Sequence, residues 1–199
     1  MHKQITHKWT QFYAKKLAAL KPEVIVWPSD EEWDDAVHIV SFDGVNFALN
    51  EPVHPTLHKD KQYFDCKGGK AGYTYEIALH LWENRIVWCN GPFPASFGKQ
   101  KIFETQGLQH AILEGKKAIA DKLFVSCDKV AHHNSLDTEE VRVFKRRACA
   151  QQERINKAFK DFNILKNCFC HGKDKHDMFV LAVVVVVTFQ LKHSPLYDV

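Results

Sequence analysis

The stretch VHIVSFDGVNFAL, residues 37–49, has the composition of a buried strand, with an aspartate where the apolar run would continue. Its valine, isoleucine and phenylalanine residues favour extended structure, because β-branched and aromatic side chains pack well on a pleated surface. Asp43 interrupts that run. It therefore either forms a turn or is directed at a ligand.

The composition is that of one globular domain. The chain has 199 residues, of which 45% are hydrophobic, enough for one substantial core. Lys and Arg number 27 against 24 Asp and Glu, an excess too small to indicate nucleic acid by itself. The six cysteines follow no secreted disulfide pattern, and the N-terminus has no apolar core of a signal peptide. We therefore expect an intracellular protein.

Hydrophobic periodicity predicts alternating strands and helices beyond this stretch. Residues 7–21 form an amphipathic pattern in which Trp9, Tyr13, Leu17 and Leu20 share one face of a helix. Thr138 is a candidate cap for a long helix that runs from about residue 137 or 138 to Leu165. The other expected elements are strands over 37–49, 73–82, 85–91 and 117–121, and a helix over 99–113.

Two of these elements have a predicted buried face. Along the strand over 73–82, a period of two puts Tyr73, Tyr75, Ile77 and Leu79 on one face. The long helix has one apolar stripe, formed by Ile155, Ala158, Phe159, Phe162 and Leu165.

The apolar run at residues 178–191 requires separate treatment, because it contains no charged residue. As a helix its fourteen residues would span about 21 Å, well below the roughly 30 Å of a bilayer's hydrocarbon core. We therefore expect a buried core segment and no membrane association. Its valines favour a strand, so periodicity leaves helix and strand both open.

Three acids have the order and setting of a two-metal phosphodiester site. Asp43 and Asp121 lie at predicted strands, and Glu153 lies on the following long helix. Carboxylate oxygens are the ligands that Mg²⁺ prefers, and paired ions can activate the attacking oxygen and stabilise the leaving one. The alternative is that all three are ordinary solvated acids, as most of the 24 acids in the chain must be.

Basic residues crowd the helix that carries Glu153. Such residues bind phosphates without reading sequence, although a run of like charge is more often a solvated helix face. The cations are Arg142, Lys145, Arg146, Arg147, Arg154, Lys157 and Lys160. DNA contact by this helix is therefore one interpretation and simple solvation is the other.

Several long motifs, taken in order, are more specific than any single acid. They are ALKPEVIVWPSD, SFDGVNFALNEP, YEIALHLWENRIVWCNGPFPA, AIAD, ERINKAFKDFNIL, HGKDKH and SPLYDV. From about Trp9 to Val199 the chain resembles harbinger-type transposases, which are DDE superfamily endonucleases. The resemblance implies a ribonuclease H-like α/β fold, a mixed central sheet flanked by helices. It also implies a catalytic domain over residues 37–199, preceded by a helix and connector over 1–36.

The resemblance further implies chemistry and location. Asp43, Asp121 and Glu153 would be the catalytic acids and would hold a pair of Mg²⁺ or Mn²⁺ ions. DNA would be the substrate, and the DNA contacts expected on the long helix are Arg146, Arg147, Arg154, Lys157 and Lys160. The nucleus is the expected compartment. No helix-turn-helix region is visible ahead of these motifs, so a separate DNA-binding partner protein is also expected.

Two departures from the family pattern lie beside the proposed acids. Members of the family commonly follow the second acid with a polar residue and Gly-Tyr, whereas this chain has Lys122, Leu123 and Phe124. They usually place Arg-His before the glutamate, where this chain has Gln151 and Gln152. A second interpretation is therefore a decayed or domesticated copy that kept the fold and binds DNA or protein without cutting.

A cluster of cysteine and histidine residues near the C-terminus offers a metal site of another kind. Cys168, Cys170, His171 and His176 offer sulfur and nitrogen ligands for zinc, but their spacing is not a common structural zinc pattern. The two histidines are better explained by local hydrogen bonds.

Overall fold

The computed structural model describes residues 2–33, 35–50, 61–122, 124 and 127–196. Its strands are β1 (His38–Ala48), β2 (Phe64–Asp65), β3 (Lys70–His80), β4 (Ile86–Pro94), β5 (Lys117–Ile119) and β6 (Val130–Ala131). Its α-helices are α1 (His2–Ala18), α2 (Lys21–Val24), α3 (Lys99–Gln106), α4 (Glu139–Asp161), α5 (Asn163–Lys166) and α6 (Lys173–His193). Single 3-10 turns are η1 (Asp30–Trp33), η2 (Lys61–Tyr63), η3 (Ala95–Phe97) and η4 (Leu108–His110).

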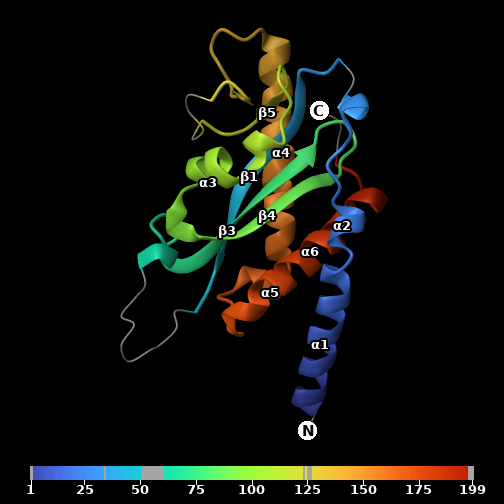
Figure 1. Ribbon diagram of the computed structural model, residues 1–199, viewed down its shortest axis with the longest axis vertical. Helices are drawn as coiled ribbons and strands as arrows, with labels where there is room; N and C mark the ends of the chain where they lie inside the picture. The colour runs from blue at the N-terminus through green and yellow to red at the C-terminus, as the bar shows by residue number, and fades with distance from the viewer. Residues whose placement is uncertain (1, 34, 51–60, 123, 125–126, 197–199) are drawn as a thin grey trace.

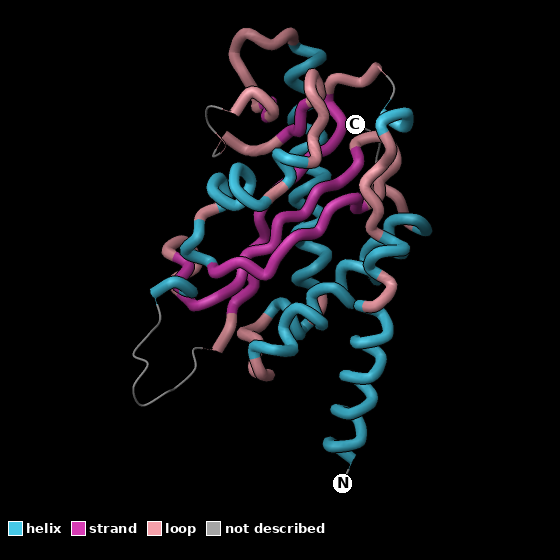
Figure 2. Tube along the Cα trace, in the orientation of Figure 1, coloured by secondary structure: helices cyan, strands magenta, loops and turns pink. Residues whose placement is uncertain are grey.

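The six strands form one mixed sheet in the order β2-β3-β1-β5-β6, and β4 also pairs with β3. β1, β3 and β4 pair antiparallel, whereas β5 and β6 continue the sheet in parallel with β1. The strand that carries Asp43 is thus central, where the antiparallel and parallel halves meet. Helices cover both faces (Figures 1 and 2), as the sequence predicted for a ribonuclease H-like fold.

Each face of the sheet has its own hydrophobic core. On one face Tyr75, Ile77 and Leu79 of β3 pack against Ile155 and Phe159 of α4 and against the valines of α6. These residues alternate along β3, so the predicted period of two is confirmed. On the opposite face the core is built around Phe42 of β1, together with Trp33, Phe103, Leu108 and Phe124. Side chains alternate along β1, so Phe42 packs beside Phe103 of α3, whereas Asp43 lies on the face that α4 covers.

The valine-rich run is part of helix α6. Val180, Val183, Val184, Val187 and Leu191 face the sheet at helical spacing. Within the described ranges, α6 is the one helix long and apolar enough to cross a membrane, but 56% of its apolar window is buried inside the fold. Packing against the sheet accounts for its composition, as expected for a core helix.

The long helix begins where its capping residue indicated. Thr138 precedes α4, and its side-chain oxygen accepts a hydrogen bond from the Val141 backbone N–H at 3.4 Å. The helix ends at Asp161, earlier than predicted, and Phe162 adopts an extended conformation before the short helix α5 begins. Leu165 on α5 still reaches the core, so the predicted apolar stripe is preserved across the break.

Two other predicted elements differ from the structure. The predicted helix over 99–113 ends at Gln106, and Gly107 is extended before η4. In α1, Trp9 and Tyr13 are 54% and 59% exposed, so the predicted apolar face is wrong at these two positions, although Leu17 of that face does pack. The buried side of α1 instead runs through Ala14, with Leu17 and Ala18, and packs against Phe179 and Ala182 of α6. Small side chains allow this close helix pairing.

Candidate active site

The three predicted acids line one pocket of about 260 Å³. Strand register explains how two of them meet. Ser41 of β1 pairs in parallel with Ile119, the last residue of β5, so Asp43 and Asp121 both follow two residues beyond that pair, with Asp121 just past the end of β5. Residues two apart point to the same face of a sheet. That face is covered by α4, because the Ser41 hydroxyl donates to Gln152 Oε1 at 3.2 Å, and Glu153 is the next residue of α4.

The pKa of the Cys149 thiol reflects how close the three carboxylates lie to it. It lines the same pocket one helical turn before Glu153. Burial raises the pKa of its thiol to about 11, and the negative charges of Asp121, Glu153 and Asp43 add to that rise. The thiol is therefore protonated at neutral pH, so Cys149 is neither a nucleophile nor a thiolate ligand in this pocket.

Asp43 is fully engaged by hydrogen-bond donors. Its Oδ1 accepts from Lys99 Nζ at 2.8 Å and from the Gly44 backbone N–H at 2.7 Å. Its Oδ2 accepts from Asn156 Nδ2 on α4 at 2.9 Å. The side chains of Asp43 and Lys99 are 29% and 28% exposed, so solvent screens this ion pair only in part.

The other two acids are more open to solvent. Asp121 is exposed in the loop after β5, and its Oδ1 accepts from the Lys122 backbone N–H at 2.6 Å. Glu153 is exposed on α4. Across the described ranges, no group of three His, Cys, Asp or Glu side chains is arranged to hold a metal ion. The pocket thus brings the acids to one place without forming a finished ligand set.

The residues that depart from the family pattern have structural roles. Gln152 is buried and its Nε2 donates to the Ile77 carbonyl at 3.3 Å, so it ties α4 to the sheet. Gln151 is also buried, and its Nε2 donates to Asn84 Oδ1 at 3.4 Å. Lys122 is exposed, Phe124 packs in the core beside Phe42, and Leu123 lies outside the described residues. The buried residues Gln151, Gln152 and Phe124 are therefore compatible with the fold.

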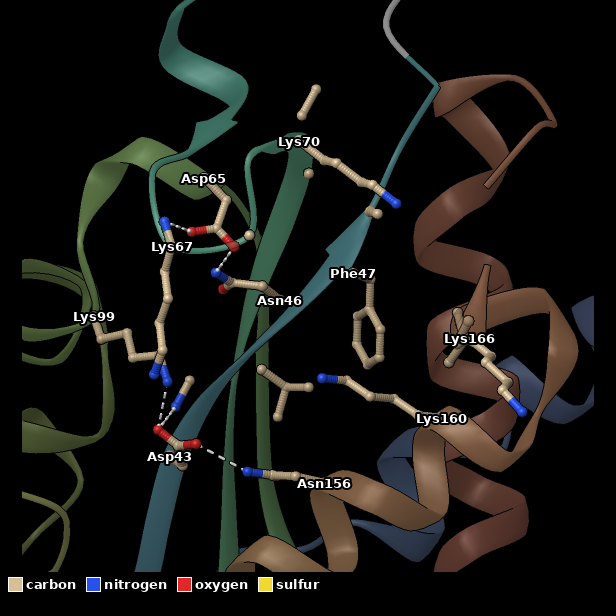
Figure 3. A pocket seen from close by; sticks show the side chains of 17 residues that line it. Asp43, Asn46, Phe47, Asp65, Lys67, Lys70, Lys99, Asn156, Lys160 and Lys166 are labelled. Carbon is tan, nitrogen blue, oxygen red and sulfur yellow. Dashed lines mark hydrogen bonds and ion pairs between the residues drawn. The ribbon is translucent and has the colours of Figure 1, made fainter. Parts of the chain in front are cut away.

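A groove rich in lysine continues from the acid pocket. It has a volume of about 450 Å³ and is lined by Lys67, Lys70, Lys99, Lys160 and Lys166. Asp43, Lys67, Lys99 and Asn156 belong to both the groove and the acid pocket. Figure 3 shows the Lys67 and Lys99 side chains pointing toward Asp43 from one side and Asn156 approaching it from the other.

The predicted DNA-contacting residues of α4 are distributed around the helix. Lys160 lines the lysine groove. Arg146, Arg147, Arg154 and Lys157 are exposed, and Arg146 forms an ion pair with Glu139 at 2.9 Å. Contact of these residues with DNA stays a prediction.

The sequence reasoning missed four lysines of the groove and Asn156. Lys67 lies in the turn that joins β2 to β3 and Lys70 is the first residue of β3, and this hairpin places both in the groove with Asn156 of α4. Asn156 lies three residues after Glu153, on the same side of the helix, which was an available signal.

The zinc alternative near the C-terminus involves a buried histidine. The Tyr75 hydroxyl lies 3.0 Å from His176 Nδ1. Burial lowers the pKa of His176 to about 4, so its ring is neutral near pH 7. Cys170 is exposed at the surface, whereas His176 is part of the core. The group of Cys168, Cys170, His171 and His176 therefore does not form a metal site in the structure.

Comparison with known proteins gives a family but no individual relative. No curated protein and no solved structure gives a match. The family model described as DDE superfamily endonuclease matches residues 42–188, more than half of the chain. The match begins beside Asp43 and spans Asp121 and Glu153. The chain therefore belongs to the DDE superfamily endonucleases.

Proposed function

We propose that this chain is a transposase-type nuclease domain of the harbinger type, which cuts and joins phosphodiester bonds in DNA through Asp43, Asp121 and Glu153. The observation that carries the proposal is the single pocket lined by all three acids, which come from strand β1, the segment just after the parallel strand β5, and helix α4. Membership of the family supports it, because DDE nucleases act on DNA and generally use divalent metals.

The donor set suits a hard divalent cation in kind. Mg²⁺ and Mn²⁺ prefer carboxylate oxygen, and the neighbouring thiol of Cys149 is protonated and does not compete. Asp43, Asp121 and Glu153 would hold the ions. When bound, such ions activate water and stabilise the leaving oxygen of a phosphodiester. Asp43 would have to exchange hydrogen-bond partners first, because both of its oxygens accept bonds from protein groups.

The lysine groove supplies a path for the DNA backbone. Five lysines line it, whereas its two acids, Asp43 and Asp65, are both hydrogen-bonded to protein donors. Ammonium groups bind phosphates and release counterions without reading base sequence. A strand lying in the groove would carry its phosphates to Asp43, because the groove and the acid pocket share residues. Arg146, Arg147, Arg154 and Lys157 are proposed to extend this contact along α4.

Nicking of supercoiled plasmid DNA tests the proposal. The wild-type chain should convert supercoiled to open-circular DNA in Mg²⁺ or Mn²⁺ and not in EDTA. Asp121→Asn and Glu153→Gln should abolish nicking, whereas the matched change Glu104→Gln, at an exposed position of α3, should preserve it. Nicking that continues undiminished in the acid variants would refute the proposal.

The second candidate is a decayed or domesticated module that binds DNA or protein without cutting. The engagement of Asp43 by Lys99 and Asn156 favours it, because these contacts occupy both carboxylate oxygens. Such a module should retain a labelled DNA duplex in EDTA and leave it intact when Mn²⁺ is added. Loss of retention in the Lys160→Ala variant would place the duplex in the lysine groove.

A further inference from the structure

The fold itself holds the Lys99 ammonium against the Asp43 carboxylate. The pair is therefore more than a contact between two flexible surface side chains. It is the first residue of α3, and its aliphatic stem crosses the backbone of β1 at Gly44. A Cβ added at Gly44 would lie 2.8 Å from Lys99 Cγ and 3.0 Å from its Cδ. The missing side chain at Gly44 therefore makes the channel through which the Lys99 ammonium reaches Asp43.

The position of Lys99 at a helix start is electrostatically unfavourable. The first turn of a helix carries partial positive charge from its free N–H groups, so cations there are disfavoured. The first turn of α3 contains no acid that would compensate. The Asp43 carboxylate provides the compensating charge instead, at 2.8 Å.

The Lys99 ammonium and a divalent cation would compete for the Asp43 carboxylate. Asp43 Oδ1 accepts from both Lys99 Nζ and the Gly44 N–H, and Lys99 lines both the acid pocket and the lysine groove. A metal ion ligated by that oxygen would lie against the ammonium, and two cations so close repel strongly in a partly buried site.

We infer that Lys99 is a built-in counter-ion that competes with the divalent cation for Asp43, so that metal binding requires Lys99 to swing into the lysine groove. There its ammonium joins Lys67 and Lys160, where a DNA phosphate would stabilise it. The inference rests on the proposed function and adds regulation to it: DNA in the groove and metal on Asp43 bind cooperatively, because each favours the released position of Lys99.

Binding of Mn²⁺, followed by the electron paramagnetic resonance signal of the free ion, tests this directly on the full chain. Lys99→Met removes the ammonium but keeps an aliphatic stem over Gly44. It should bind Mn²⁺ at least about tenfold more tightly than the wild type, because the repulsion is gone. The matched control is Lys101→Met, since Lys101 lies on the same helix with its ammonium over the Phe97 ring and should leave affinity unchanged.

The outcomes separate this inference from the proposed nuclease function. The gain in Lys99→Met should disappear when Asp43→Asn is added, which assigns the bound ion to Asp43. Equal affinity in wild type and Lys99→Met would overturn the inference and leave the nuclease proposal standing. Absence of Mn²⁺ binding in both would overturn the two together. Tighter Mn²⁺ binding by Lys99→Met, in a chain that never nicks DNA, would support the inference and refute the nuclease.

Discussion

Two acids on neighbouring strands, Asp43 of β1 and Glu76 of β3, show how environment sets the role of a carboxylate. Glu76 pairs in register with Gly44, the residue next to Asp43. Because side chains alternate along a strand, the two acids point to opposite faces of the sheet. Asp43 opens into the acid pocket, whereas Glu76 is only 3% exposed.

The partners of the two acids differ more than their positions do. Asp43 faces an ammonium, an amide and a backbone N–H. Glu76 Oε2 accepts from Trp88 Nε1 and from the Leu108 N–H, both at 2.8 Å, and its Oε1 has no hydrogen-bond partner among the described residues. Burial raises the pKa of Glu76 to about 7, although these two hydrogen bonds oppose the rise. Asp43 therefore differs from Glu76 in having a counter-charge, the Lys99 ammonium, and not only in its degree of burial. This makes Asp43 the acid suited to bind a cation.

The largest expected effect separates the two acids by catalysis. Asp43→Asn removes a ligand charge from the acid pocket and should lower metal-dependent nicking at least about 100-fold, the size typical of losing one electrostatic stabiliser. Glu76→Gln acts on the opposite face of the sheet and should keep nicking within about threefold at pH 6. Plasmid nicking rates at saturating Mn²⁺ measure both, after circular dichroism has shown that each variant is folded. Equal losses in the two variants would remove the functional distinction between them.

The next effect is the pH dependence of stability caused by Glu76. Its folded pKa of about 7 lies above its ordinary value of 4.5, so between these values the folded state holds a proton that the unfolded state has lost. The contribution of Glu76 is therefore fully present below pH 4.5 and is lost as pH rises to about 7. The loss is about 3 kcal/mol at 1.36 kcal/mol per pH unit.

Urea denaturation from pH 4 to 8 measures this contribution as a difference between variants. The free energy of unfolding of Glu76→Gln, minus that of the wild type, should rise by up to about 3 kcal/mol across the window. The difference is needed because His176, whose pKa burial lowers to about 4, changes stability in the opposite direction as pH rises from 4 to 6.5. Glu114→Gln, at an exposed position, is the control and should give a flat difference. A flat difference for Glu76→Gln would mean that Glu76 is solvated.

Local sequence patterns predicted the central elements of the fold, and the three acids that they indicated line one pocket. The alternation along residues 73–79 indicated the correct face of β3, and Asp43 and Asp121 line one pocket because β1 and β5 run in parallel up to Ser41 and Ile119, just before the two acids. The catalytic role of the acids stays a prediction. The buried face of β3 depends on local periodicity, and the proximity of Asp43 and Asp121 depends on the direction of their strands. The order of strands and helices along the chain largely determines that direction. The place of Glu153 on the following long helix indicated the third acid, and the family resemblance implies a catalytic role for all three.

Features that depend on distant packing could not be predicted. Lys99 reaches Asp43 only because the loop after β4 brings the start of α3 across Gly44, and no periodicity describes that placement. The valines of α6 favour a strand by their own propensity, but burial against the sheet overrides it. In α1 the aromatic residues matched a helical stripe, yet α6 selected the side of Ala14, where small residues permit contact.

A smaller effect measures how strongly Lys99 and Asp43 interact. A double-mutant cycle with Asp43→Asn and Lys99→Met should give a coupling of about 1 kcal/mol in the free energy of unfolding. This is at the upper end for exposed ion pairs, because both side chains are less than a third exposed. Chemical denaturation in EDTA at low ionic strength measures the coupling, and 1 M salt should reduce it. Coupling near zero would mean that Asp43 depends on Asn156 and Gly44 alone.

The smallest effect concerns Gly44, the position that separates the two acids along the sheet. Gly44→Ala places a Cβ within 2.8 Å of Lys99 Cγ, so the lysine stem must lift and its ammonium must leave Asp43. The lost ion pair costs about 1 kcal/mol, while replacing glycine within a strand by alanine recovers roughly 0.5–1 kcal/mol. The net change in unfolding free energy should therefore be within about 0.5 kcal/mol of zero. In a Lys99→Ala background, where there is nothing left to displace, the same change should be stabilising by roughly 0.5 kcal/mol or more. Urea denaturation of the four proteins measures both values.

Mn²⁺ affinity should rise in Gly44→Ala as it does in Lys99→Met, because both changes remove the ammonium from Asp43. An unchanged affinity would show that the ammonium finds Asp43 by another route, and that the space at Gly44 does not control it.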